Sequence, residues 1–574
     1  MTGDNMKKHP LEFFKEHNIN PRSMQTEVLE RVYKEWDNYN YFALSLPTGV
    51  GKSYIATAIA DSVKNAYLLT STLALQDQYM HSWDEIVNLK GRSNYTCGIN
   101  PIFTVDAAPC AANPQLLNHC RQARVCPYIN QKVKALAAPA MITNPLYMLY
   151  STHCGFAKDE DSPWVSRDVV IMDESHNLES ALCSFAESDI DPQKLHDDFG
   201  AQTQHITFTG RPEEDYMKVI EIKEILMNKA LEMAVKLEQE FPKANLVGID
   251  PREWAKGFTG KVAERVKKLN GKIYQLDKAI QPLKIFFNTH NTPDELVNRW
   301  IVTKQSDVNI LKLAPIYGDF LFHEYFGKLA DKFVFLSATL GTKKEFCKEL
   351  GIAEKECLFI ETDSPFKPEL SPVIVMPSIK LSRDVYDVNV KKVGGLIDDI
   401  MSIHPNDRGV IHGVTYDICK HIYQGVTEEN RKRLLYRDMD ILRNASDGSN
   451  QFPKKYKNDE LLEIHEISGG SYGSVLLSPS MMEGIDLYDD LARFQIIIKL
   501  PWASLGDVRV KMKSQLDGNW YTNKMWLHVL QASGRSTRHE TDFSTTYILD
   551  KNFSFFYDEW KAKLPGWFKK RLVF

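Results

Sequence analysis

A glycine-rich turn containing a lysine and a serine lies early in the chain, at Leu46-Pro-Thr-Gly-Val-Gly-Lys-Ser53. Glycines let backbone amides approach phosphate oxygens, and a helix that opens after the turn presents its positive end to the anion. Lys52 would neutralise the β and γ phosphates of ATP, and Ser53 would bind Mg²⁺. Leu46 replaces the first glycine of the general pattern, but strand, loop and helix follow in the required order, which disfavours an ordinary glycine turn. The residues expected to bind the nucleotide here are Thr48, Gly49, Val50, Gly51, Lys52 and Ser53.

Two carboxylates follow a predicted strand at 168–172. Asp173 would take the Mg²⁺, usually through water, and Glu174 would orient the attacking water and help to deprotonate it. Alone, an acidic pair followed by a histidine fits a solvated loop or a helix cap equally well. Together with Lys52, the pair predicts a site that hydrolyses ATP.

A motif near the end of the chain, Gln531-Ala-Ser-Gly-Arg-Ser-Thr-Arg538, places two arginines three residues apart. This spacing puts them on one side of a helix or of its terminal turn. Arg535 and Arg538 would reach across a cleft between domains and stabilise charge on the γ phosphate, with Gln531 in the same catalytic group. The alternative is a solvent-facing basic turn.

Four cysteines fall within thirty residues and leave twelve, nine and five residues between neighbours. The paired CxxC spacing that is usual for structural zinc is absent. A cluster held by four thiolates tolerates wide spacing, so Cys97, Cys110, Cys120 and Cys126 are interpreted as ligands of an iron–sulfur cluster. Zinc stays an alternative, and His119 could replace Cys120 as a ligand. Four unrelated free thiols are disfavoured in so short a stretch.

The chain has 574 residues and a net charge of −5. A chain of this length can bury more than one core and should divide into about three or four domains. No apolar run approaches the length that spans a bilayer, and the start has no apolar signal core. We therefore expect a cytoplasmic protein, in a reducing environment where clustered cysteines bind metal more often than they form disulfides. The charge gives no global attraction to nucleic acid, so local surfaces would have to bind it.

Short apolar runs alternate with helical segments and predict two α/β domains with parallel sheets. In the first domain, strands are expected at 41–46, 66–70, 168–172 and 333–337, with a helix at 52–64. In the second domain, strands are expected at 409–414, 474–478, 494–498 and 545–549. Two stretches interrupt the first pattern, because residues 91–135 hold the cysteines and residues 181–310 are rich in charged helical sequence. Ligands of such sheets bind beyond the carboxyl ends of the strands, where the polar motifs begin.

With these motifs in order, the chain resembles the XPD/DinG family of superfamily 2 helicases over nearly its whole length. Lys90-Gly-Arg-Ser-Asn-Tyr-Thr-Cys97 and Cys126-Pro-Tyr128 are similar to the segments that carry the first and last cluster cysteines. Arg22 and Gln25 resemble the element that contacts the adenine side of ATP. The remaining motifs in family order are Ser71-Thr-Leu-Ala-Leu-Gln-Asp-Gln78, Ser337-Ala-Thr-Leu340, Ser364-Pro-Phe366, Glu483-Gly-Ile-Asp486 and Lys499-Leu-Pro501. By this resemblance Asp486 would contact the nucleotide, and Thr72, Ser337 and Thr339 would contact nucleic acid.

The resemblance implies two RecA-like motor domains, with an iron–sulfur domain and a helical arch inserted in the first. The expected bounds are 1–90, 136–180 and 311–359 for the first motor domain, 91–135 for the iron–sulfur domain, 181–310 for the arch and 360–574 for the second motor domain. The implied cofactors are ATP, Mg²⁺ and a cluster of the 4Fe-4S type. The implied activity is that of an ATP-dependent DNA helicase in repair, recombination or replication. It would move 5′ to 3′ on single-stranded DNA, act on forked or tailed duplexes, and work as a monomer away from membranes.

Two other functions fit the same motifs. Such motors grip the backbone and these motifs do not read the sugar, so an RNA or RNA–DNA hybrid helicase is one alternative. An ATP-gated clamp on nucleic acid is another, although the full set of Lys52, Glu174, Arg535 and Arg538 favours turnover. Lys52→Ala separates the two classes, because a motor would lose unwinding while a clamp would keep its binding role.

Overall fold

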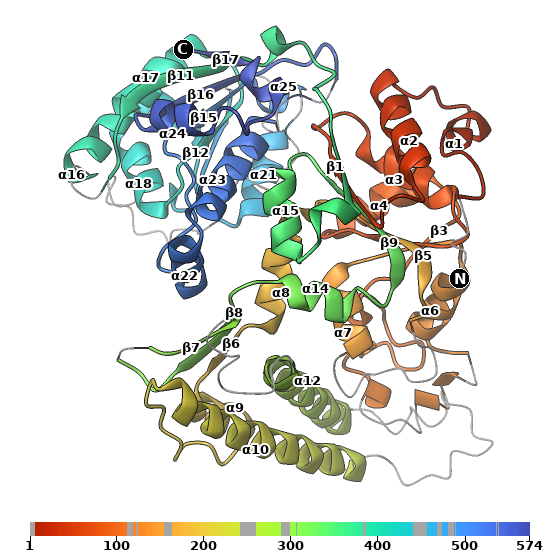
Figure 1. Cartoon of the computed structure of the whole chain (residues 1–574). Helices are drawn as coiled ribbons and strands as arrows, with labels where there is room; N and C mark the ends of the chain where they lie inside the picture. The colour runs from red at the N-terminus through yellow and green to blue at the C-terminus, as the bar shows by residue number, and fades with distance from the viewer. Residues whose placement is uncertain are drawn as a thin grey trace.

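Two parallel sheets, one built from strands between residues 41 and 361 and the other from strands between residues 373 and 573, form the cores of the computed structural model (Figure 1). The structure describes residues 6–111, 117–118, 120–121, 124–153, 164–240, 260–288, 299–305, 307–382, 386–439, 456–467, 473–479, 487, 489–534, 537 and 539–574. The first sheet has the strand order β10-β1-β9-β5-β2-β4-β3. Its strands are β1 (Tyr41–Ser45), β2 (Ala66–Leu69), β3 (Ile86–Asn88), β4 (Ala140–Thr143), β5 (Arg167–Met172), β9 (Ala330–Ser337) and β10 (Cys357–Glu361).

Both faces of this first sheet are buried. Phe42 and Leu44 of β1 pack in one apolar cluster, while Ala43 between them packs in the other, because successive strand residues point to opposite faces. Burial on two faces explains why these strands read as continuous apolar runs in the sequence. The helices that follow the strands or cover the sheet are α1 (Leu11–Glu16), α2 (Ser23–Glu35), α3 (Lys52–Asp61), α4 (Leu73–Ser82), α6 (Pro127–Ala137), α7 (Pro145–His153), α8 (Leu178–Ala186), α14 (Asp319–Tyr325) and α15 (Lys343–Leu350).

The central strands of the first sheet end at the same edge. Ser45 of β1 pairs with Ser337 of β9, and Leu69 of β2 pairs with Met172 of β5. All the pairs in this sheet are parallel, so the loops that leave these strands emerge side by side. The register therefore gathers the glycine-rich turn, the acidic pair and the motif at 337–340 at one edge.

The second sheet repeats this arrangement later in the chain, with the order β13-β14-β12-β15-β16-β11-β17. Its strands are β11 (Val373–Ile379), β12 (Gly409–His412), β13 (Leu434–Leu435), β14 (Val475–Ser478), β15 (Phe494–Ile497), β16 (Thr545–Asp550) and β17 (Leu572–Val573). Its helices are α16 (Tyr386–Asn389), α17 (Val393–Ile403), α18 (Tyr416–Gly425), α19 (Glu428–Arg433), α21 (Asn458–Ile467), α22 (Val508–Leu516), α23 (Gly518–Ser533), α24 (Phe553–Trp560) and α25 (Gly566–Lys569). The two sheets confirm the predicted fold class of two parallel α/β domains.

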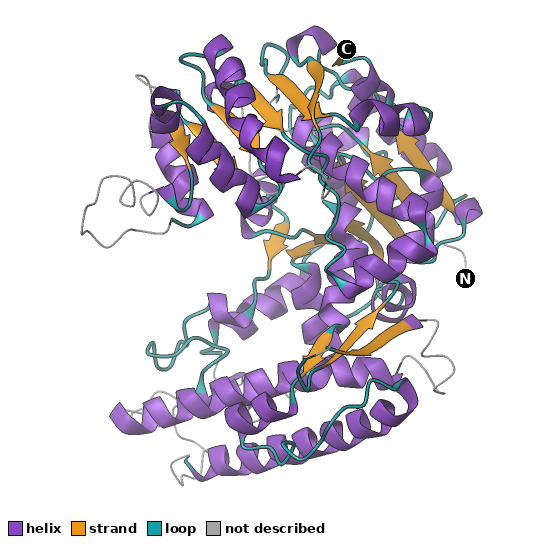
Figure 2. Ribbon diagram, turned by 90° about the vertical axis from the view of Figure 1, so that its left-hand side faces the viewer, coloured by secondary structure: helices purple, strands orange, loops and turns teal. Residues whose placement is uncertain are grey.

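A helical insertion stands apart from both sheets, and Figure 2 shows its two long helices lying together. Its helices are α9 (Pro192–Phe199), α10 (Pro212–Gln239) and α12 (Gly260–Asn288). At its base lies an antiparallel sheet with the order β6-β8-β7, built from β6 (Ser188–Ile190), β7 (Trp300–Lys304) and β8 (Leu311–Pro315). Sequence patterns did not indicate this sheet, and the predicted limit at residue 310 falls between β7 and β8. Among the described residues, no helix combines the length and apolar character that crossing a bilayer requires.

The base of this insertion packs directly on a helix of the second α/β domain. Val508 and Met512 of α22 lie against a small apolar cluster formed by Ile301, Ala314 and Ile316. The insertion therefore contacts a helix of the second α/β domain, as well as the first domain from which it emerges.

The cysteine-bearing segment has little regular structure in the residues described. It contains two short 3₁₀ turns, η1 (Arg92–Asn94) and η2 (Pro109–Ala111), and leads into α6. Phe103, Val105 and Ala108 are buried beside the cysteines in the larger core of the first domain. The described residues of this segment therefore pack in the same core cluster as the first domain.

Candidate functional site

The loop before α3 is shaped for a phosphate group. Gly49 and Gly51 have φ angles of 79° and 77°, a left-handed backbone that favours glycine. Lys52 and Ser53 begin α3, so the free amides of the first turn face the loop. A Cβ atom on Gly51 would lie 2.5 Å from Nε2 of Gln25. Open amides and a positive helix end together fit a polyphosphate.

Two residues of the N-terminal segment hold this loop from outside. The guanidinium of Arg22 donates to the carbonyl of Gly49. Nε2 of Gln25 donates to the carbonyls of Val50 at 3.0 Å and Gly51 at 3.3 Å, and its Oε1 accepts from the Arg22 amide at 2.8 Å. Both side chains therefore set the shape of the loop, and their contact with adenine stays a prediction.

Asp173 and Glu174 follow β5 and lie beside this loop. Oδ2 of Asp173 accepts a hydrogen bond from the hydroxyl of Tyr79, and Oδ1 accepts one from the Glu174 amide, each at 2.9 Å. Burial and the Glu174 charge raise the pKa of Asp173 to about 6, although Lys52 lowers it. Burial and the Asp173 charge hold the pKa of Tyr79 well above its usual value, so its hydroxyl stays a donor. A divalent cation here would favour the ionised carboxylate, so this arrangement fits Mg²⁺ bound with ATP.

The three predicted nucleic-acid contacts lie in two environments. Thr72 is exposed and caps α4, where its side chain accepts the Leu75 amide at 3.2 Å. Ser337 and Thr339 are buried at the end of β9. Oγ of Ser337 lies 2.9 Å from Nδ1 of His176, and the hydroxyl of Thr339 has no hydrogen-bond partner in the described part of the chain. The acidic motif and β9 are thus joined, and nucleic-acid contact by these three residues stays a prediction.

The two motor domains meet at the phosphate loop. Oγ1 of Thr48 donates to the carbonyl of Gly534 at 2.6 Å, across 486 positions of sequence. Gln531 is buried one turn before Gly534, and neither its amide nitrogen nor its amide oxygen has a hydrogen-bond partner among the residues described. An unpaired buried amide at this interface fits a polar ligand between the domains. The predicted positions Arg535, Arg538 and Asp486 lie outside the described residues.

A buried cluster of charges forms a second contact between the domains. Glu179 of α8 accepts hydrogen bonds from Arg509 at 2.6 Å and Lys513 at 2.8 Å, both on α22 of the second domain. The amide of Gly318 also donates to Glu179 at 3.2 Å. The two cations overcome burial and hold the pKa of Glu179 below its usual range. The cluster lies where the first domain, the helical insertion and the second domain meet.

The four predicted cluster ligands come together in the structure. Cys110, Cys120 and Cys126 are buried, and Cys97 is half-buried beside them. A hydrogen bond between Cys110 and Cys120 lowers the pKa of the Cys110 thiol and raises the pKa of the Cys120 thiol. The charges of Cys97 and Cys126 raise the pKa of Cys120 further. Four neighbouring thiols are a donor set that fits an iron–sulfur cluster. The alternative ligand His119 lies outside the described residues.

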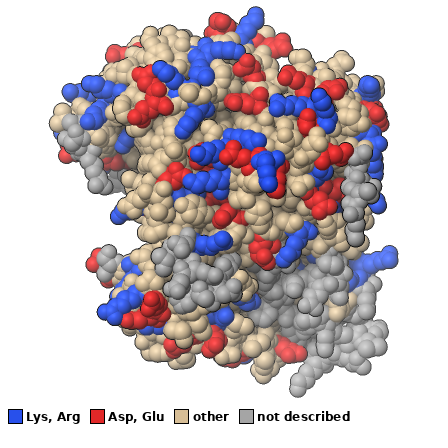
Figure 3. Space-filling view, in the orientation of Figure 1, with Lys and Arg blue, Asp and Glu red and all other residues tan. Residues whose placement is uncertain are grey.

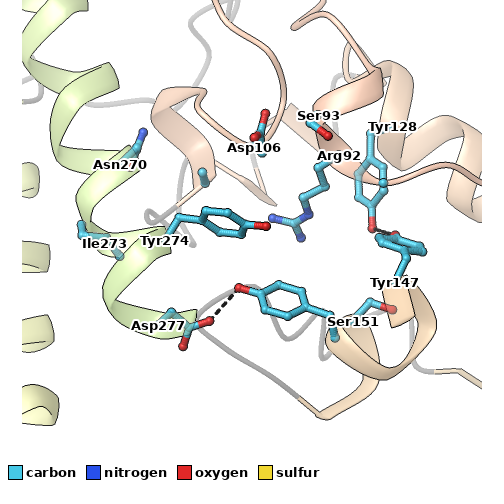
Figure 4. Close-up of a pocket in the computed structure, with 13 residues that line it drawn as sticks. Arg92, Ser93, Asp106, Tyr128, Tyr147, Ser151, Asn270, Ile273, Tyr274 and Asp277 are labelled. Atoms are coloured by element: carbon cyan, nitrogen blue, oxygen red, sulfur yellow. Dashed lines mark hydrogen bonds between the residues drawn. The ribbon is translucent and has the colours of Figure 1, made fainter. Parts of the chain in front are cut away.

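A cavity of about 140 Å³ lies between this cysteine segment, α7 and α12 (Figure 4). Arg92 and Tyr274 point toward one another across it, and the Arg92 guanidinium lies 5.1 Å from the centre of the Tyr128 ring. The hydroxyl of Tyr150 donates to Asp277 at 2.7 Å and links α7 to α12. Aromatic rings beside a guanidinium group can stack on a nucleobase.

Tyr79 and Glu179 were missed from the sequence, as were Arg509 and Lys513, the partners of Glu179. Tyr79 and Asp173 are 94 positions apart, and Glu179 and Arg509 are 330 apart. The only available signal was local, because Tyr79 lies about two helical turns after Thr72 and directly follows the motif that ends at Gln78. No pattern along the chain identifies the partner of either residue, because each pair meets only in the folded protein.

Two parallel α/β domains that face each other across a phosphate loop define a two-domain, RecA-like motor fold. Residues 397–571 match a family model described as "Helicase C-terminal domain", and residues 18–214 match one described as "Type III restriction enzyme, res subunit". A solved XPD helicase structure has the same fold, with a TM-score of 0.59 at 13% identity over 95% of this chain and 98% of that chain.

Curated relatives agree with these matches. The chain is 35% identical to the ATP-dependent DNA helicase CHL1 of Candida albicans over an alignment of 121 residues, and the match covers 17% of this chain and only 14% of that protein. It is 19% identical to a "Probable ATP-dependent helicase" of Methanocaldococcus jannaschii, over 93% of this chain and 92% of that protein. These matches and the shared fold support the resemblance of the chain to XPD/DinG-like helicases of superfamily 2.

Proposed function

We propose that the chain is an ATP-dependent DNA helicase that moves 5′ to 3′ along single-stranded DNA and couples hydrolysis to unwinding. The hydrogen bond from Thr48 to Gly534 carries this proposal, because it brings the phosphate loop of one motor domain against the Gln531–Arg538 motif of the other. A nucleotide between them would contact both domains, so its binding and release would change their spacing. The direction of movement and a role in repair, recombination or replication rest on the family resemblance.

Each residue around the loop would have a separate role in ATP hydrolysis. Lys52 would neutralise the β and γ phosphates, Ser53 and Asp173 would hold Mg²⁺, and Glu174 would accept a proton from the attacking water. Mg²⁺, when bound, supplies positive charge that offsets the phosphates. The side chains that would stabilise charge on the γ phosphate from the second domain are those of Gln531, Arg535 and Arg538.

The gathered thiols support the proposal that Cys97, Cys110, Cys120 and Cys126 hold a 4Fe-4S cluster. Such a cluster would stiffen a segment with little regular structure and let it act as a wedge at a fork. The neighbouring cavity with Arg92 supports a path for single-stranded DNA between this segment and the arch, because its rings could stack on bases. Charges of both signs are interspersed on the face in Figure 3, so contacts would be local and not spread over one basic surface.

The decisive experiment compares ATP-driven strand separation on 5′-tailed and 3′-tailed DNA duplexes, with protein purified without oxygen. We expect unwinding of the 5′-tailed duplex, and Lys52→Ala should abolish it. Lys64→Ala is the matched control, because Lys64 is an exposed lysine just beyond the same helix. Activity only on the 3′ tail would contradict the proposed direction.

The same assay separates the other functions. Unwinding of tailed RNA or RNA–DNA hybrids in preference to DNA would favour an RNA helicase. Nucleic-acid binding that needs ATP but never separates strands would favour a clamp. We propose that the protein acts as a monomer on forked or tailed DNA in the cytoplasm, where a reducing environment keeps the four thiols available to a cluster.

A further inference from the structure

Tyr79 is a buried residue that touches the predicted Mg²⁺ ligand from outside the acidic motif. Its side chain is 1% exposed, and its hydroxyl donates to Oδ2 of Asp173 at 2.9 Å. The amide of Glu174 donates to the other oxygen, Oδ1, at the same distance. One donor on each oxygen restrains the rotation of the carboxylate, and Lys52 of the phosphate loop lies near enough for its charge to lower the Asp173 pKa.

The Tyr79 ring is itself held in place by packing. It belongs to the apolar cluster that contains Ile59 of α3 and Trp83 at the end of α4. α3 is the helix that begins with Lys52, so the ring lies between the phosphate-binding helix and α4. The direction of the hydroxyl therefore follows the position of α4 and not free rotation of an exposed side chain.

The other end of α4 lies at the surface. The helix begins after Thr72, whose side chain caps it, and the preceding Ser71 carbonyl accepts a hydrogen bond from Asn144 at 2.8 Å. Thr72 is exposed and is the predicted contact for a DNA strand. Tyr79 is seven positions after Thr72, roughly 10 Å along the helix axis. A single short helix thus joins a surface open to a phosphate backbone to a buried metal ligand.

We propose that Tyr79 is a positioning residue that orients Asp173 for Mg²⁺ and transmits the position of α4, set by a DNA strand at Thr72, to that carboxylate. This inference rests on the function proposed above. A strand that binds at the start of α4 would move the helix, redirect the Tyr79 hydroxyl and change how well Asp173 holds Mg²⁺. DNA would then stimulate hydrolysis through the metal ligand.

The test uses Tyr79→Phe, which keeps the ring and removes only the hydroxyl. Tyr67→Phe is the matched control, because Tyr67 is also buried in the first domain but donates to the Val165 carbonyl, at 2.8 Å. Binding of a fluorescent ATP analogue to the whole chain is titrated with Mg²⁺, without DNA. We expect Tyr79→Phe to raise the half-saturating Mg²⁺ concentration about tenfold, because removing a hydrogen-bond partner that orients a metal ligand weakens metal binding by about this factor. Binding in EDTA should not change, and Tyr67→Phe should match the wild type.

Stimulation of ATP hydrolysis by single-stranded DNA tests the second half of the proposal, measured at saturating Mg²⁺. We expect Tyr79→Phe to lose most of the stimulation and Tyr67→Phe to keep it. Unchanged stimulation in Tyr79→Phe would overturn the link to α4. An unchanged Mg²⁺ requirement, or an equal rise in both variants, would overturn the positioning role and leave the proposed helicase function standing. A wild-type chain that binds no nucleotide with Mg²⁺ would overturn both.

Discussion

The nucleotide loop is shaped at the scale of single residues by side chains that bind its backbone. Gln25 donates to the carbonyls of Val50 and Gly51, while Gly51 itself adopts a φ of 77°. Any side chain at this position would meet both obstacles, an unfavourable backbone angle and the amide of Gln25. Gly51 is therefore more constrained than its place in a flexible turn indicates.

We expect Gly51→Ala to destabilise the first domain by about 1–3 kcal/mol and to weaken ATP binding, because the loop must move or Gln25 must leave it. Gly395→Ala is the control. Gly395 lies in α17, and a Cβ there meets nothing within 4 Å, so this change should stabilise the protein by about 0.5–1 kcal/mol. Urea unfolding and nucleotide titration measure both effects. Normal ATP affinity in Gly51→Ala would show that the loop adapts without Gln25.

At this scale the sequence predicted the residues whose types carry chemistry in a local motif. The structure places Lys52 close enough to Asp173 for the lysine charge to lower the pKa of that carboxyl. Tyr79 could not be predicted, since a single tyrosine in a helix of mixed polar and apolar residues reads as core, and its hydroxyl meets Asp173 only through the order of the strands. The same holds for Glu179, whose partners lie in the other half of the chain.

At the scale of elements, buried parallel strands were the most predictable parts. The run at 41–46 became β1 (Tyr41–Ser45), and the run at 494–498 became β15 (Phe494–Ile497), because strands covered on both faces are apolar throughout. The sheet of β6, β7 and β8 was missed. Its strands are short and mix polar with apolar residues, as Ser188-Asp-Ile190 does, and they flank long charged helices that dominate the pattern.

The cysteine segment gives a prediction at the same scale. We expect Cys110→Ser to remove the cluster absorbance and unwinding while leaving much of the ATP binding, because η2 lies outside the phosphate loop. Cys419→Ala, at a buried thiol of the second domain, should keep the absorbance and the bound iron. Iron content, visible absorbance and nucleotide titration check these outcomes. Equal loss of ATP binding in Cys110→Ser would show that the cluster supports the whole first domain.

At the scale of the whole molecule, the contact through Glu179 holds the two motor domains together. Removing one member of a buried charge cluster leaves its partners uncompensated. We expect Glu179→Ala to destabilise the protein by about 3–5 kcal/mol and to lower the first unfolding midpoint in urea. Glu324→Ala breaks only the exposed pair with Lys328 and should change stability by less than about 1 kcal/mol. Similar losses in both variants would show that the interface does not depend on Glu179.

The packing of α22 on the sheet at the base of the arch has a consequence for attempts to shorten the protein. Val508 and Met512 are covered by Ile301, Ala314 and Ile316, so the arch supplies part of the surface on which the second motor domain rests. A chain cut down to its two motor domains by deleting residues 188–315 would expose this apolar patch to water and invite aggregation. The arch therefore cannot be exchanged alone between relatives, and a chimaera that carries another arch would also need the matching α22.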